Sequence, residues 1–267
     1  MGSKDPVLSL LKDFGYNVVR LPRTNIRPLQ LFEKQGNDLV FLGEMPKLFK
    51  AGADAPLPAI GPDDQAGFIN GQRSRDLNIS VGLSILSGII SALGGGTLGL
   101  NAGYKKASTL SFVFDDVKVN QIDRLDLSKF LTAAQIDESV GPPAKLVEAD
   151  KLYVVTSTIK SNKFTTEAKK SDGTSVGVDV PVIQNAMSGK VEVKTEGSSQ
   201  SKVTYEGNIP LVFGFQAIRL VFENGRFTQA VPVAPTETGM RAIAHGEEPE
   251  MLETESPFTS VFIEPDA

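Results

Sequence analysis

Few side chains in this sequence have the types and spacings that chemistry at a protein site requires. The 267-residue chain contains one histidine, His245, and no cysteine, which excludes a thiol nucleophile, a disulfide and a cysteine-based zinc site. His245 has no second ligand at a metal-binding spacing. The glycines at 94–96 lack the following Lys and Ser or Thr of a phosphate-binding loop. We therefore expect no cofactor site and no catalytic residue.

Four aspartates could in principle bind a hard cation, namely Asp115, Asp116, Asp123 and Asp126. A solvated turn explains the first two better, and a helix start explains the other two. There is also no nucleophile elbow and no dinucleotide-binding fingerprint. An enzyme would need a site assembled from residues scattered in the sequence, and nothing indicates one. We predict no metal site and no enzymatic activity.

One long stretch without any charged residue, residues 77–104, is here called the uncharged segment. Apolar residues alternate with small or polar ones near both of its ends, and side chains of period 2 point to opposite faces of a strand. The pattern predicts two strands joined by a short connection at residues 86–96. The apolar positions are Leu77, Ile79, Val81, Leu83 and Ile85 in the first run and Leu98, Leu100, Ala102 and Tyr104 in the second.

The pattern of the uncharged segment leaves three interpretations open. A transmembrane helix needs about 20 apolar residues, and the seven glycines of the segment argue against it. A half-buried hairpin in a soluble sheet is the simplest interpretation. The third is a hairpin that leaves the soluble fold and joins a membrane β-barrel, because each alternating run is close to the roughly 9–11 residues of a spanning strand.

Charge is unevenly distributed along the chain. The net charge is −5, but residues 236–267 hold eight acids and one base, so this acidic tail carries −7 and residues 1–235 carry +2. Removal of the tail would leave a basic body that is better placed to approach anionic lipid. Arg20, Arg23 and Arg27 form a small basic cluster and are candidates for lipid contact. The alternatives are a solvated tail without function and a solvated strand edge.

The remaining sequence predicts short helices and many strands. Its 40% of hydrophobic and 22% of charged residues are typical of a globular protein. Helices are expected at residues 6–14, 123–134 and 180–187. Strands are expected at residues 16–21, 28–33, 38–43, 109–117, 151–160 and 208–222. Residues 190–194 and 202–205 predict a second hairpin, which carries more charge than the first.

Several segments together resemble one protein family. They are DFGYNVVRLPR at residues 13–23, the glycine-rich region 82–104, SFVFDDV at 111–117, YVVTSTIKSNKF at 153–164 and VTYEGNIPLVFGFQAIRLVF at 203–222. In this order they resemble the gasdermins, and the bacterial branch in particular. The resemblance covers nearly the whole chain. No single motif is a signature by itself.

The resemblance implies a pore-forming protein that a short C-terminal tail holds inactive as a cytoplasmic monomer. A partner protease, often caspase-like, cuts before the tail, and the freed body forms a large homo-oligomeric ring in the lipids of the inner membrane. Two hairpin regions, here about residues 77–114 and 153–205, extend into strands of a β-barrel. Cell death then limits phage spread, and no nucleic acid is involved. The inhibitory tail would be residues 251–267, docked through Phe258, Val261 and Phe262, and the cut would lie within residues 235–250.

The N-terminus departs from the family pattern. Bacterial gasdermins typically carry a cysteine among the first few residues, and palmitate attached to it occupies a hydrophobic pocket. Gly2 and Ser3 stand there in this chain. Either this member functions without the lipid, or the Met-Gly-Ser start replaces the native residues. Acylation by that route is impossible in the sequence as it stands.

Together, the elements and the resemblance predict an α+β protein with a twisted, mainly antiparallel sheet and flanking short helices, like a gasdermin N-terminal domain. Residues 1–235 would be the pore-forming domain, residues 236–250 an acidic protease-sensitive linker and residues 251–267 the autoinhibitory peptide. The competing hypothesis is a soluble β-rich binding module whose acidic tail recruits a partner.

Overall fold

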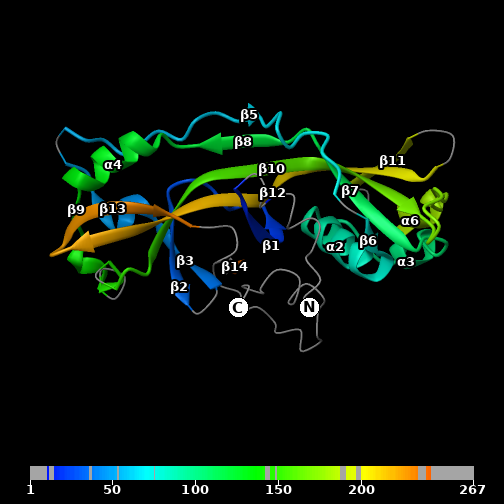
Figure 1. The fold of residues 1–267 in the computed structure, drawn as a ribbon, viewed down its shortest axis with the longest axis horizontal. Coiled ribbons are helices and arrows are strands. Elements are labelled where there is room, and N and C mark those ends of the chain that lie inside the picture. Colours follow the sequence, from blue (N-terminus) through cyan, green and yellow to red (C-terminus); the bar gives the residue numbers. More distant parts are fainter. Residues whose placement is uncertain are drawn as a thin grey trace.

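Two long antiparallel strands, β10 (Leu152–Lys169) and β12 (Lys202–Glu223), run along the molecule and carry the rest of the fold (Figure 1). They pair from Tyr153 opposite Arg219 to Glu167 opposite Lys202, with three register shifts on the way. Both sequences are rich in Val, Ile, Thr, Tyr and Phe, which fit a pleated and half-buried surface. The other strands of the main sheet are attached to this pair directly or through a neighbour.

The computed structural model describes residues 11, 15–35, 38–52, 54–74, 76–141, 145–147, 149–186, 191–196, 200–233 and 239–241. The remaining strands of the main sheet are β1 (Asn17–Arg23), β2 (Gln30–Gln35), β3 (Asp38–Glu44), β5 (Asp64–Gln65), β6 (Leu77–Asn78), β7 (Thr109–Asp115), β8 (Lys118–Gln121), β11 (Val191–Glu196), β13 (Arg226–Pro232) and β14 (Gly239–Arg241). A small second sheet consists of β4 (Phe49–Lys50) and β9 (Gln135–Ile136). The helices are α2 (Ile79–Ala92), α3 (Leu100–Gly103), α4 (Arg124–Ala133) and α6 (Val180–Ala186), with 3-10 turns η1 (Met45–Lys47) and η2 (Glu138–Val140).

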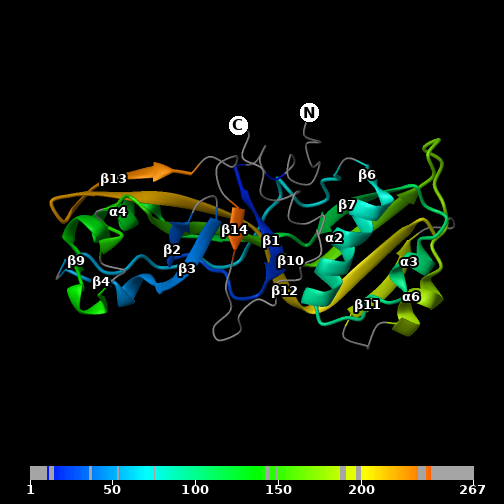
Figure 2. The same cartoon turned by 90° about the horizontal axis from the view of Figure 1, so that it is seen from below.

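Six strands form a closed circuit of hydrogen-bonded neighbours. β12 pairs with β1, β1 with β14, β14 with β3, β3 with β2, β2 with β10, and β10 with β12 again. β14 is parallel to both of its neighbours, with Met240 opposite Val19 on one side and opposite Leu39 on the other. In Figure 2 this orange strand lies between β1 and β3. A segment from the acidic tail therefore returns to the body and completes the circuit.

The two ends of the long strands have different surroundings (Figures 1 and 2). At one end β7 and β11 flank them, and α2, α3 and α6 pack against the sheet around a core that includes Phe112 and Tyr205. At the other end β2, β13 and α4 enclose a second core that includes Leu127 and Phe222. A third apolar cluster, around Phe215, belongs to the circuit between the two ends.

The predicted fold class is confirmed, since the protein is α+β with a mainly antiparallel sheet and short flanking helices. The strands expected between residues 16 and 43 are β1, β2 and β3, and those expected at 109–117, 151–160 and 208–222 are β7 and parts of β10 and β12. The second hairpin is β11 with the start of β12. The expected helices at 123–134 and 180–187 are α4 and α6. The helix expected at residues 6–14 falls, apart from Leu11, outside the described residues.

The prediction that the uncharged segment forms two strands is wrong for this structure. Only Leu77 and Asn78 belong to a strand, β6, and the next fourteen residues form helix α2. The second alternating run contains the short helix α3 and a turn. The buried positions of α2 recur with helical spacing, and they are Gly82, Ile85, Leu86, Ile89 and Ile90.

The helix prevails because it satisfies its backbone groups internally, whereas a strand at the edge of a sheet needs a partner along its length. β6 finds such a partner for two residues only, in β7. The Asn78 side chain accepts a hydrogen bond from the Ser80 amide and caps α2. The residues interpreted as the start of a connection, from Leu86 to Ile90, instead complete the apolar stripe of the helix.

Candidate functional site

The candidate site is the face of the sheet on which the uncharged segment lies. Helix α2 approaches strand β7 closely at Gly82, where an added Cβ would lie 2.7 Å from the Cβ of Leu110. At its far end Leu93 packs over Gly207 of β12, where an added Cβ would lie 2.6 Å from a Leu93 methyl carbon. Between these points the apolar side chains of α2 pack into the core of this end of the molecule. Shape and apolar burial therefore hold the helix on the sheet.

A buried polar cluster fixes the other end of the uncharged segment. Tyr104 follows α3 and is 1% exposed, and its hydroxyl lies 2.6 Å from Oγ1 of Thr166 and 2.8 Å from the hydroxyl of Tyr205. Burial raises the pKa of Tyr104 to about 12, and burial also raises the pKa of Tyr205 well above its ordinary value. Both phenols are therefore protonated throughout the physiological pH range.

An ion-pair network marks the beginning of the segment. Arg73 pairs with Asp76 and, through Nε, with Glu167 at 3.0 Å, and the same Nε donates to the Ser111 hydroxyl at 3.0 Å. Lys169 approaches the other oxygen of Asp76 at 3.7 Å. Arg73 and Asp76 are exposed and Glu167 and Lys169 are partly buried, so each pair contributes on the order of 1 kcal/mol. The network therefore positions the chain before α2 more than it stabilises the fold.

The outer surface of the uncharged segment is unusual for an exposed helix. Ile79, Val81 and Leu83 are only partly buried, and Leu98, in the connection to α3, is 95% exposed. Lys105 and Lys106 follow directly and are exposed. Among the described residues no helix combines the length and the apolar character needed to cross a bilayer.

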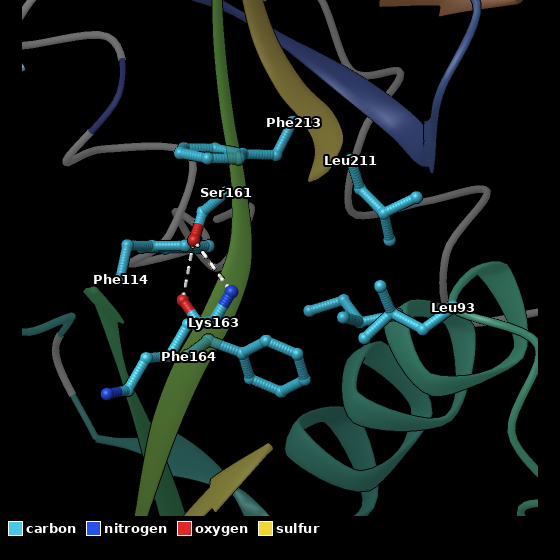
Figure 3. Close-up of a pocket in the computed structure, with 8 residues that line it drawn as sticks. Leu93, Phe114, Ser161, Lys163, Phe164, Leu211 and Phe213 are labelled. Carbon is cyan, nitrogen blue, oxygen red and sulfur yellow. Dashed lines mark hydrogen bonds between the residues drawn. The ribbon is translucent and has the colours of Figure 1, made fainter. Parts of the chain in front are cut away.

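A small pocket lies between the end of α2 and the two long strands, and Figure 3 shows its lining side chains. Phe114 and Phe213 stack at 4.5 Å between ring centroids on one side of it. The Ser161 hydroxyl accepts a hydrogen bond from the Lys163 amide at 2.9 Å, so its polar group is already used. The volume is about 20 Å³, enough for a water molecule and far too small for an acyl chain. The lining residues are Ile89, Leu93, Phe114, Ser161, Lys163, Phe164, Leu211 and Phe213.

The four aspartates singled out in the sequence have ordinary structural partners. Asp115 accepts a hydrogen bond from Thr165, and Asp116 pairs with Lys118. Asp123 caps α4 with its carboxylate, and Asp126 in the first turn pairs with Lys129. Within the described part of the chain no three His, Cys, Asp or Glu side chains are grouped so as to hold a metal ion.

Of the basic residues and tail residues singled out in the sequence, only some lie in the part of the chain that the structure describes. Arg27 forms an ion pair with Glu44 at 2.9 Å, and its side chain is 60% exposed. Arg20 and Arg23 belong to β1, but their side chains are outside the described part. The lipidation region, Gly2 and Ser3, and the tail residues Phe258, Val261 and Phe262 also lie outside it. β14 falls inside the segment predicted to be a protease-sensitive linker.

Sequence reasoning missed the two partners of Tyr104. The alternating pattern places Tyr104 on an apolar face, although a buried tyrosine hydroxyl needs a hydrogen-bond partner. Thr166 and Tyr205 are 62 and 101 residues away along the chain. The alternating pattern of residues 202–205 was the available signal, because it put Val203 and Tyr205 on the buried face of a strand.

This chain is similar to known proteins in both fold and sequence. The solved structure of a bacterial gasdermin from Bradyrhizobium tropiciagri superposes with a TM-score of 0.65 at 17% identity, covering 90% of this chain and 98% of that chain. The sequence profile of the Bacterial Gasdermin Family matches residues 19–226. Gasdermin bGSDM of a Desulfuromonadales bacterium is 46% identical over 260 residues, which is 97% of this chain and 98% of that protein. Gasdermin bGSDM of Lysobacter enzymogenes is 44% identical over 227 residues, covering 85% of this chain and 84% of that protein. This chain belongs to the bacterial gasdermin family.

Proposed function

We propose that this protein is a protease-activated pore former of the bacterial inner membrane that acts in antiphage defence. The intact chain is a cytoplasmic monomer. A caspase-like protease cuts within residues 235–250, residues 251–267 are released, and the body assembles into a large β-barrel ring that kills the cell. Membership of the bacterial gasdermin family, together with an uncharged segment docked as a helix on the sheet, carries this proposal.

The uncharged segment supports the proposal because its sequence suits two structures. As a helix it buries one apolar stripe against the sheet. As a strand it would put Ile79, Val81 and Leu83 on one face and small or polar residues on the other, with no charge on either. A lipid-facing strand needs this pattern, and a charge near the bilayer midplane would cost about 2–4 kcal/mol. The segment begins with β6, which pairs with β7, so an extended segment would continue this edge of the sheet.

The second hairpin supports the proposal in a complementary way. β11 and the start of β12 pair from Val191 opposite Gly207 to Glu196 opposite Lys202. Val191, Val193 and Val203 are buried, whereas Lys194 and Lys202 are exposed. In a membrane strand of this hairpin the valine face would meet lipid and the charged face would line the water-filled interior.

β14 suggests how the tail restrains the body. Three residues, Gly239–Arg241, link β1 to β3 in the strand circuit. A cut before β14 removes this strand from the body. A cut after β14 leaves the strand attached to the body, but only the pairing of its three residues then keeps it in the sheet. Loss of β14 would leave one edge of β1 and one edge of β3 without hydrogen-bond partners. Unpaired strand edges favour association with other chains.

Dye release from liposomes of anionic lipid tests the proposed function. The full chain with an inserted protease site in residues 242–250 is compared before and after cutting, and the chain without the site receives the same protease as the control. We expect release only from the cut chain. No release from a cut chain that remains folded and soluble would contradict pore formation and would favour a binding module whose acidic tail recruits a partner.

A further inference from the structure

Three buried hydroxyl groups join the end of the uncharged segment to both long strands. Tyr104 belongs to the segment, Thr166 to β10 and Tyr205 to β12. Each of the three residues is at most 1% exposed, and the two tyrosines are among the largest fully buried side chains described. The Tyr205 ring also stacks on Phe164 at 5.4 Å between centroids, which fixes the position of its hydroxyl.

The protons of these hydroxyls define a direction for the network. Each hydroxyl has one proton to donate. Thr166 donates to the carbonyl oxygen of Val203 at 3.2 Å. The arrangement that uses every proton then runs from Tyr205 to Tyr104, from Tyr104 to Thr166, and from Thr166 to Val203. Tyr104 is the central member, because it both accepts and donates inside the network.

We propose that Tyr104, Thr166 and Tyr205 form a latch that holds the uncharged segment on the sheet and controls how readily the segment is released. The inference rests on the proposed function for its biological meaning, but the latch itself is a property of the intact chain. Most of the segment meets the sheet through apolar side chains such as Leu86 and Ile90, whose contacts are not directional. Hydrogen bonds require a fixed distance and direction, so they define one docked position.

The direction of the network ranks the variants. Tyr104→Phe removes both of the bonds that Tyr104 makes, to Tyr205 and to Thr166, so it has a large effect. Thr166→Val leaves the Tyr104 proton without an acceptor. Tyr205→Phe leaves the bond from Tyr104 to Thr166 intact and has the smallest effect. A buried polar group left without a partner is more costly than a hydrogen bond lost with both partners.

Hydrogen exchange measured by mass spectrometry on the uncut full chain tests the latch. We expect the amides of residues 79–104 to exchange about tenfold faster in Tyr104→Phe and Thr166→Val, about threefold faster in Tyr205→Phe, and at the wild-type rate in Thr166→Ser, which restores the hydroxyl. The amides of β2 and β3 should keep their wild-type rates, because the opening is local.

Thr165→Val is the matched control, because it is the same substitution at the adjacent position on the opposite face of β10. The Thr165 hydroxyl bonds to Thr204 and Asp115, away from the segment. The control should leave exchange in residues 79–104 unchanged. Equal acceleration by Thr165→Val and Thr166→Val, or wild-type exchange in Tyr104→Phe, would overturn the latch.

Dye release separates failure of the latch from failure of the proposed function. With both correct, cut Tyr104→Phe releases dye after a shorter lag than the cut wild type. If no cut chain releases dye but exchange in residues 79–104 is accelerated as ranked, the latch is supported and pore formation is contradicted. If the cut wild type releases dye and Tyr104→Phe changes neither exchange nor lag, the latch is wrong and pore formation stands.

Discussion

Helices α2 and α4 lie toward opposite ends of the long strands and differ in the chemistry of their outer surfaces (Figure 1). Each is capped by the side chain before it, Asn78 for α2 and Asp123 for α4, and each buries an apolar stripe. The difference is on the outer surface. α4 exposes Arg124 and Lys129, whereas α2 has no charged residue at all. The sequence of α4 is compatible with a surface helix only, and that of α2 is compatible with a helix here and with a strand in lipid.

The largest expected difference between the two helices concerns charge. Leu83 on α2 is partly buried, so in Leu83→Lys the long side chain can reach water and the intact chain remains folded. In an inserted strand the same charge would cost about 2–4 kcal/mol in every copy of the ring. Cut Leu83→Lys should release no dye. Leu125→Lys on α4, where the wild-type side chain is 72% exposed, should release dye like the wild type. Equal dye release by both variants would contradict the idea that α2 enters lipid and α4 does not.

Truncation of one fully buried leucine in each helix should separate local from global stability. Leu86 is 0% and Leu127 is 1% exposed, and Leu→Ala at such sites costs about 2–5 kcal/mol. We expect Leu127→Ala to lower the free energy of unfolding in urea by that amount. Leu86→Ala should instead accelerate hydrogen exchange in residues 79–104 more than a hundredfold, with a smaller change in the urea midpoint. The same midpoint shift in both variants would show that α2 unfolds only with the whole domain.

A substitution at Gly82, where α2 closely approaches the sheet, should change the rate of dye release by less than the substitutions above. Gly82→Ala gains about 1 kcal/mol of helix propensity, but its Cβ would lie 2.7 Å from the Cβ of Leu110, which cannot move without its backbone. Overpacking of this kind costs about 1–3 kcal/mol, so the clash prevails. Cut Gly82→Ala should therefore release dye faster. Gly67→Ala, with no atom within 4 Å of the added Cβ, is the control and should match the wild type.

The two helix caps predict the smallest effects. Loss of an N-cap side chain costs about 0.5–2 kcal/mol. Asp123→Ala should lower the melting temperature, because we expect α4 to unfold only together with the whole domain. Asn78→Ala should leave the melting temperature nearly unchanged and shorten the lag of dye release after the cut. If Asp123→Ala shortened the lag of dye release and Asn78→Ala left it unchanged, then α4 and not α2 would be the helix whose release precedes the pore.

The same two helices explain how much of the fold the sequence could reveal. α4 was predictable, because Leu127, Phe130 and Leu131 have helical spacing and Asp123 precedes them. α2 was not, because its first residues alternate like a strand, and the choice depends on packing against β7. β14 was also out of reach, since three residues with partners in two distant strands carry no local pattern. The Tyr104 partners were missed for the same reason of distance along the chain.

A scan with single cysteines can follow the change of the uncharged segment from helix to strand, because the sequence contains no other cysteine. Each position from 79 to 85 is labelled in turn with an environment-sensitive fluorophore, and emission is recorded in the intact chain and on anionic liposomes after the cut. In the intact chain we expect a helical period, with the most buried label at position 85, while a label at position 82 has no room beside Leu110 and should itself displace the helix. On liposomes we expect a period of two, with positions 79, 81, 83 and 85 in lipid and quenched by a lipid-borne quencher. A helical period that persists on liposomes while dye is being released would contradict the conversion of the uncharged segment from a docked helix to a membrane strand.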